Sequence, residues 1–115
     1  MVISLTKNLF EEKISFLSEE FKFKGNKPAI IDWYASWCNP CKIVAPILED
    51  LSQEYEDKID IYKIDVDQEQ ELAMAFGIQS VPSMLFIPLN GEPQMAQGAL
   101  PKQTFKRIFS EVFNI

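Results

Sequence analysis

The chain has 115 residues, no histidine and a formal net charge of −6. So acidic a chain is poorly suited to nucleic acid or an anionic membrane surface, because basic patches supply most of that attraction. The missing histidine excludes Ser-His-Asp and Cys-His catalysis and any histidine-ligated metal site. We expect one globular domain over residues 1–115, which can bury roughly two thirds of the surface that its unfolded chain exposes. Such a domain needs neither a metal nor a disulfide to hold its core.

The N-terminal third predicts two strands and a helix. A short strand at residues 2–5 precedes a helix over residues 7–21, for which Thr6 is a suitable N-cap. The turn "GNKP" at 25–28 leads into "AIIDWYA" at 29–35, an apolar run of strand type. The apolar stripe of the predicted helix consists of Leu9, Phe10, Ile14, Leu17 and Phe21.

The middle of the chain predicts a helix, a strand and a second, shorter helix. The long helix covers residues 39–55, and Pro46 inside it should produce a kink. The run "KIDIYKIDVD" at 58–67 is a strand, and residues 68–76 form a helix that Gly77 ends. The expected buried side of the long helix consists of Ile43, Ile47, Leu48 and Leu51.

The C-terminal part predicts a hairpin and a final helix. The strand "SMLFI" at 83–87 is joined through an Asn-Gly turn to a strand at 94–97. The last helix begins near Pro101 and carries Phe105, Ile108, Phe109 and Val112 at helical spacing. Early strands separated by helices should pair in parallel, whereas the late hairpin is antiparallel. We therefore expect an α/β fold with a central mixed sheet of four or five strands, flanked by four helices.

The two cysteines, in "WCNPCK", could be a structural staple, part of a metal site, an inert reduced pair or a redox pair. A staple between Cys38 and Cys41 closes a loop of only four residues, which is worth about 2 kcal/mol on the loop-entropy expression. A metal site needs about four ligands, and the chain has neither a second cysteine pair nor a histidine. The sequence therefore favours redox chemistry.

The position of the pair at a helix start supports this interpretation. Cys38 lies in the first turn, where free backbone N–H groups and the helix dipole favour its thiolate. Cys41 lies one turn further on, close enough to bridge and expected to be less exposed, and Pro40 suits the first turn. The spacing makes attack by the second sulfur on a mixed disulfide an intramolecular step.

With these residues, the chain resembles the thioredoxin family nearly from end to end. The matching segments are "DWYASWCNPCKIVAPILEDLSQEY", "YKIDVD", "FGIQSVPSMLFI" and "NGEP" followed by "GAL". The resemblance implies a thioredoxin-like fold in which Cys38 is the nucleophile and Cys41 the resolving residue. It also implies that no cofactor binds the chain, since the redox group is the Cys38–Cys41 disulfide.

Further site residues follow from the resemblance. Asp32 matches a buried aspartate that exchanges protons with Cys41, through water in our interpretation, and burial should raise its pKa. Lys63 matches a lysine that approaches this aspartate and modulates it. Val81 precedes Pro82, whose peptide bond is expected to be cis and to present the Val81 backbone to a substrate. The other residues expected around the substrate groove are Trp37, Asn39, Pro40, Gly98 and Ala99.

Two residues depart from the usual family pattern. Tyr34 stands where many members carry a second tryptophan, and Asn39 replaces the glycine of the usual "CGPC" motif. Donors of the Asn39 side chain could reach the Cys38 sulfur or a nearby backbone group, and stabilisation of the thiolate by them would make the pair more oxidising. Conversely, the pair lacks the interior histidine that strongly oxidising relatives often have, and Val81 leans towards a reductase. We expect a reductant.

The function expected is that of a monomeric protein disulfide reductase. Its partners would be disulfide-containing proteins and an electron donor such as a flavin-dependent thioredoxin reductase that uses NADPH, with no nucleic acid or membrane. No signal peptide is evident, so we expect a cytoplasmic protein, or a periplasmic or extracytoplasmic one if a signal peptide has been removed. Two alternatives are an extracytoplasmic thiol–disulfide oxidoreductase and a redox-independent binding adaptor with a thioredoxin fold.

Overall fold

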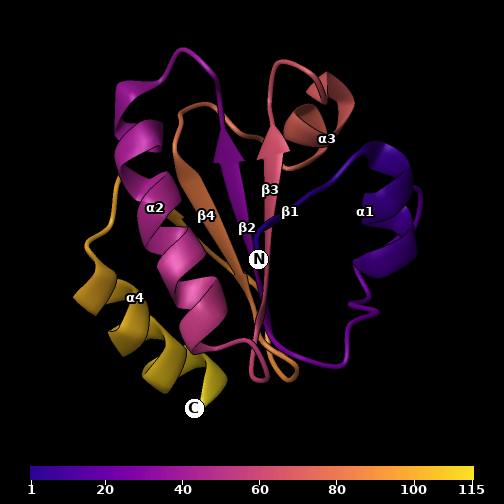
Figure 1. Ribbon diagram of the computed structural model, residues 1–115. Helices are drawn as coiled ribbons and strands as arrows, with labels where there is room; N and C mark the ends of the chain where they lie inside the picture. Colours follow the sequence, from indigo (N-terminus) through magenta and orange to yellow (C-terminus); the bar gives the residue numbers. More distant parts are fainter.

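The computed structural model describes all 115 residues and contains a five-stranded sheet with helices on both faces (Figure 1). The elements are β1 (Ile3–Ser4), α1 (Lys7–Lys13), β2 (Ala29–Tyr34), α2 (Asn39–Glu54), β3 (Asp60–Asp65), α3 (Gln70–Ala75), β4 (Ser83–Ile87), β5 (Gln94–Gln97), α4 (Lys102–Ile108) and a terminal π-helix (Phe109–Phe113). None of the helices is both long and apolar enough to cross a membrane. The predicted α/β fold is confirmed, and the additional N-terminal strand is present.

The strands run in the order β1-β3-β2-β4-β5, with β2 in the centre. Strand β3 is parallel to β1 and β2, whereas β4 is antiparallel to both β2 and β5. Five of the six residues of β2 are buried, as expected for a strand covered on both faces. In the register of β2 and β3, Asp32 lies beside Lys63 and Tyr34 lies beside Asp65.

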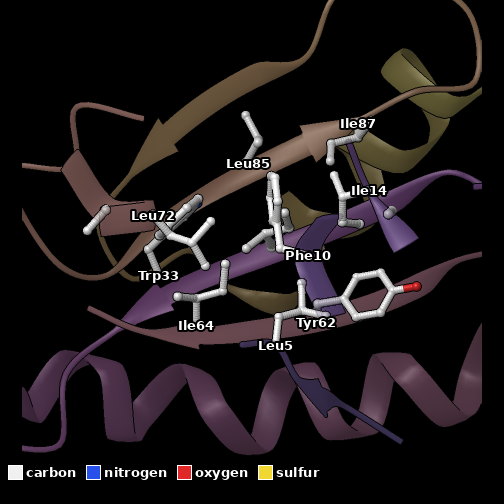
Figure 2. Packing of buried hydrophobic residues seen from close by; sticks show 12 residues of the cluster. Leu5, Phe10, Ile14, Trp33, Tyr62, Ile64, Leu72, Leu85 and Ile87 are labelled. Atoms are coloured by element: carbon white, nitrogen blue, oxygen red, sulfur yellow. The ribbon is translucent and has the colours of Figure 1, made fainter. Parts of the chain in front are cut away.

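One core cluster fills the space between the sheet, α1 and α3. Figure 2 shows Phe10 near its centre, with Trp33, Leu85 and Tyr62 around it. The buried members are Leu5, Phe10, Ile14, Ala29, Ile31, Trp33, Tyr62, Ile64, Leu72, Ala73, Leu85 and Ile87. Because successive strand residues point to opposite faces, this cluster takes Ile31 and Trp33 of β2 and leaves the residues between them to the other face.

The second cluster lies on the opposite face, beneath α2 and α4. It contains Ile30 and Phe86 from the sheet, Leu48 from α2, and Phe105 and Phe109 from the C-terminal helix. In the π-helix that follows α4, the rings of Phe109 and Phe113 stack with their centroids 5.7 Å apart. Helix α2 is thus held against the face of the sheet that carries Asp32.

The first helix is shorter than predicted. It begins as expected, with Thr6 Oγ1 accepting a hydrogen bond from the Leu9 N–H, but it ends at Lys13 rather than at residue 21. Beyond Lys13, side chains rather than helix carbonyls accept hydrogen bonds from the backbone: Glu11 accepts from the Leu17 N–H, and Ser15 accepts from the Lys22 N–H. The apolar stripe still packs on the core, although its second half is not helical.

One further expectation is wrong, and one is confirmed. Ile43 was expected on the buried side of α2 but is 65% exposed, because the helix turns Cys41, Val44, Leu48 and Leu51 towards the core. The predicted antiparallel hairpin from β4 to β5 is present with its expected bounds, and residues 88–93, which contain the Asn-Gly pair, connect the two strands. Prolines at both ends of that connection cannot donate ladder hydrogen bonds, and only Gly91 has a positive φ there.

Candidate active site

The two cysteines lie where β2 passes into α2. Cys38 is the N-cap residue of α2, with φ −88° and ψ 111°, and its sulfur accepts a hydrogen bond of 3.2 Å from the Cys41 N–H. A capping sulfur in this position faces the free N–H groups and the positive end of the helix dipole, both of which favour a thiolate. Pro40 occupies the first turn, where its missing N–H costs nothing.

Cys38 and Cys41 form a disulfide with their Cα atoms 5.3 Å apart. In this state both residues are only 4% exposed, so the expected difference in exposure between them is absent. They pack with Ala35, and half-buried Tyr34, Val66 and Val81 surround them. No group of three or more acidic, cysteine or histidine side chains could hold a metal ion.

Asp32 lies on β2, six residues before Cys38, on the sheet face covered by α2. It is 4% exposed, and its Oδ1 atom is buried without a hydrogen-bond partner. Burial raises the pKa of this carboxyl to about 7, although the positive charge of Lys63 acts in the opposite direction. A carboxyl with this pKa can both accept and return a proton near neutral pH.

A pocket of about 360 Å³ reaches Asp32 from the surface. Asp32 and Lys63 line it from the sheet, and Lys42 and Glu49 contribute charged groups from α2. Its remaining lining residues are Val2, Ala45, Pro46 and Leu48. The pocket has both the size and the polar groups needed to admit water to the unpartnered oxygen of Asp32.

A second hollow lies beside the disulfide. Trp37 forms one wall with 67% of its surface exposed, and its Nε1–H donates a 2.9 Å hydrogen bond to Asp67 Oδ2. The lining residues of this hollow of about 130 Å³ are Trp37, Val66, Ile78, Gln79, Ser80 and Val81. The tryptophan is therefore fixed from the loop after β3, although its ring faces solvent.

Three loops meet at this edge of the sheet, which lies uppermost in Figure 1. The Val81–Pro82 peptide bond is cis, as the resemblance predicts, and the Gly98 N–H donates to the Pro82 carbonyl over 2.8 Å. Gly98 has a φ of +94°, which suits glycine, and Ala99 after it is exposed. Ser83 Oγ, from the first residue of β4, donates to the Ser80 carbonyl over 2.7 Å.

Of the predicted substrate-groove residues, Val81 packs against the disulfide, whereas Asn39 makes neither of the contacts considered for it. The Asn39 side chain is exposed and makes no hydrogen bond to a backbone group or to the Cys38 sulfur, whose donor is the Cys41 N–H. Sequence reasoning also missed Asp67 and Ser83. Asp67 lies in an acidic run that indicates only a solvated surface, and no local pattern marks either hydrogen bond.

Comparisons with known proteins agree with this geometry. The thioredoxin family model matches residues 1–111. A thioredoxin of Borreliella burgdorferi is 46% identical, covering 98% of each chain, and a thioredoxin of Bacillus subtilis is 39% identical over 71% of this chain and 79% of that protein. The crystal structure of chloroplastic thioredoxin z superposes with a TM-score of 0.83 and 26% identity, covering 96% of this chain and 93% of that one.

Whole-length sequence similarity, the shared fold and the bonded cysteine pair at the start of α2 lead to the same conclusion. The chain belongs to the thioredoxin family and is a thiol–disulfide oxidoreductase.

Proposed function

We propose that the chain acts as a reductant of disulfide bonds in other proteins. The Cys38 thiolate attacks one sulfur of the substrate disulfide, forms a mixed disulfide and releases the other substrate sulfur as a thiolate. The Cys41 thiolate then attacks the Cys38 sulfur, so that the Cys38–Cys41 bond forms and the second substrate thiolate leaves. The substrate gains two electrons and takes up two protons, and the protein's dithiol loses both.

The environment of the Cys38 sulfur carries the proposed direction. Its hydrogen-bond donor is a backbone N–H of the same helix turn, and the chain has no histidine that could place a positive charge beside it. Strong oxidants of this kind owe their potential to a stabilised reduced form. With only a helix N-terminus to stabilise the thiolate, the pair should favour the oxidised state and therefore give its electrons away.

Asp32 is proposed to take the proton of Cys41 as that thiol becomes a nucleophile. Three features support this role: the burial of Asp32, its unpartnered Oδ1 atom and a pKa near 7. The pocket that reaches it gives water access from solvent, so that the proton can leave after each cycle. Lys63 lowers the proton affinity of Asp32 and thereby keeps a fraction of it ionised at neutral pH.

The substrate is proposed to lie across Val81 as an added strand. The N–H and C=O groups of Val81 make no backbone hydrogen bond, whereas the carbonyls of Ser80 and Pro82 on either side have donors. An extended substrate segment could therefore pair with Val81 alone. Trp37, Asn39, Pro40, Pro82, Gly98 and Ala99 would form the surface around that segment.

The expected partners are disulfide-containing proteins and a thioredoxin reductase or an equivalent electron donor. We propose a single-domain monomer that binds no cofactor of its own and works in the cytoplasm.

The equilibrium potential against glutathione tests the direction. A value of about −270 mV, typical of thioredoxins, would support a reductant, whereas a value of about −120 mV would make the protein an oxidant and overturn the proposal. Insulin reduction by wild type and by Cys38→Ser tests the chemistry. The variant should lose this activity, and any cellular function that it retained would indicate a redox-independent adaptor.

A further inference from the structure

Lys63 carries a charge that no acidic group neutralises directly. Its ammonium takes part in none of the five ion pairs and in no side-chain hydrogen bond, although Lys63 lines the pocket that reaches Asp32. The one specific contact of the ammonium is with the ring of Tyr34, whose centroid lies 5.8 Å from Nζ. This distance is within the range of about 6 Å over which a cation is attracted to an aromatic face.

The register of two strands explains this arrangement. Asp32 and Tyr34 lie two residues apart on β2, so both side chains point to the sheet face under α2. Lys63 of β3 lies directly beside Asp32 and one diagonal step from Tyr34. Its long side chain can therefore reach either the carboxyl or the ring without any change in the backbone.

We propose that Tyr34 is a positioning residue that holds the Lys63 ammonium over its ring, beside the carboxyl group of Asp32. This inference rests on the proposed role of Asp32 in proton transfer. A lysine side chain that lacks an ion pair has many rotamers, and those that extend into solvent leave Asp32 without its positive neighbour. The ring favours the rotamers that keep the charge close, and so gives Tyr34 an indirect control over the proton affinity of Asp32.

The ring itself stays neutral under these conditions. Burial and the nearby carboxylates of Asp65 and Asp32 raise the pKa of the Tyr34 hydroxyl, so no phenolate competes for the ammonium. The other titratable groups facing this place are Lys42 and Glu49 from α2, Asp65 from β3, and the two cysteines at the start of α2.

The expected effect has an upper limit. At the strength usual for exposed sites, attraction to the half-buried Tyr34 ring biases the lysine rotamers by about two- to fivefold. Loss of the ring can therefore raise the proton-binding constant of Asp32 by at most that factor, which is about 0.3 to 0.7 pH units.

The test titrates the Asp32 carboxyl by carbon NMR in the oxidised, full-length protein. The disulfide removes both thiols from the titration and the chain has no histidine, so a carboxyl that titrates near neutral pH is assigned to Asp32. Tyr34→Leu removes the ring, and Tyr34→Phe is the matched control that keeps it. Lys63→Met removes the charge, and Tyr34→Leu is then repeated in that background.

We expect Tyr34→Leu to raise the Asp32 pKa, Tyr34→Phe to leave it unchanged, and Tyr34→Leu to have no further effect once Lys63 is methionine. An equal shift in both backgrounds would mean that Tyr34 acts on Asp32 by packing or solvation alone, and would overturn the inference; so would the absence of a shift. The rate of insulin reduction against pH is measured in parallel. If the rate does not change across the pH range in which Asp32 titrates, the proposed proton transfer by Asp32 is refuted, even if the NMR titrations support the positioning of Lys63 by Tyr34.

Discussion

Replacing Asp32 by asparagine should remove most of the pH dependence of stability between about pH 4 and pH 8. The carboxyl has an ordinary pKa of 3.8 and a pKa of about 7 in the folded protein, because burial disfavours its charged form. The folded state therefore binds this proton more tightly than the unfolded state does. Stability from this group is complete below pH 3.8 and is lost as the pH rises to about 7.

The size of the effect follows from the same two values. They lie about three pH units apart, and each unit is worth about 1.4 kcal/mol, so the wild type should lose about 4 kcal/mol across this range. Discounting for solvent is small, because Asp32 is only 4% exposed. This amount is a large part of the total stability of a small domain, which is about 5–15 kcal/mol.

The assay is urea unfolding of the oxidised protein at several pH values, which avoids titration of the thiols. Asp32→Asn should gain stability over wild type as the pH rises, whatever its offset at low pH from burying an amide. Asp57→Asn is the control, because Asp57 is exposed after α2 and should leave the wild-type pH dependence intact. If the curves of stability against pH for wild type and Asp32→Asn stay parallel, burial does not raise the pKa of Asp32 in the folded protein, and the reasoning is refuted.

Three more substitutions test the surroundings of the disulfide. Asn39→Gly should change the equilibrium potential by less than about 30 mV, because Asn39 makes no hydrogen bond to the Cys38 sulfur and 30 mV corresponds to one hydrogen bond of about 1.4 kcal/mol. A larger fall in the potential would show that Asn39 stabilises the thiolate. Asp67→Ala should release the Trp37 indole and raise KM for protein substrates by about two- to tenfold with kcat unchanged, and an unchanged KM would argue against a fixed wall. Ser83→Ala should lower stability by about 1 kcal/mol and raise KM, and Ser83→Thr should restore both; failure of threonine to do so would exclude the hydroxyl contact to Ser80 as the cause.

Local sequence patterns predicted the parts of the fold whose causes are local. The apolar run of β2, the helix that starts at the cysteine pair and the strand "SMLFI" all appear within one or two residues of their expected bounds. The cysteine pair was also recognisable, because its spacing and the following helix suffice to suggest redox chemistry.

Helical spacing of apolar residues was less reliable at two places. Beyond Lys13, the side chains of Glu11 and Ser15 satisfy backbone N–H groups, so the core-facing residues continue without a helix. In α2, Leu48 and Leu51 are buried as predicted, but Val44 faces the sheet in place of Ile43. Spacing alone does not tell which of two neighbouring apolar residues is buried.

Two side-chain contacts between distant segments could not be predicted. The approach of Lys63 to Tyr34 depends on the register of β2 against β3, and the bond between Trp37 and Asp67 joins two loops. Both pairs lie about thirty residues apart in the chain, where no periodic signal connects them. The residue types alone give no sign of these contacts, which exist only because the fold places the two segments next to each other.

The Cys38–Cys41 bridge spans the first turn of a single helix, so opening it releases no long loop and separates no strands. The dithiol and disulfide forms of the protein should therefore have almost the same shape, and should differ in a few atoms at one end of the sheet. In the proposed function, a reductase must recognise the disulfide form and a substrate must recognise the dithiol form. Both partners must distinguish the two forms on the small surface around Cys38.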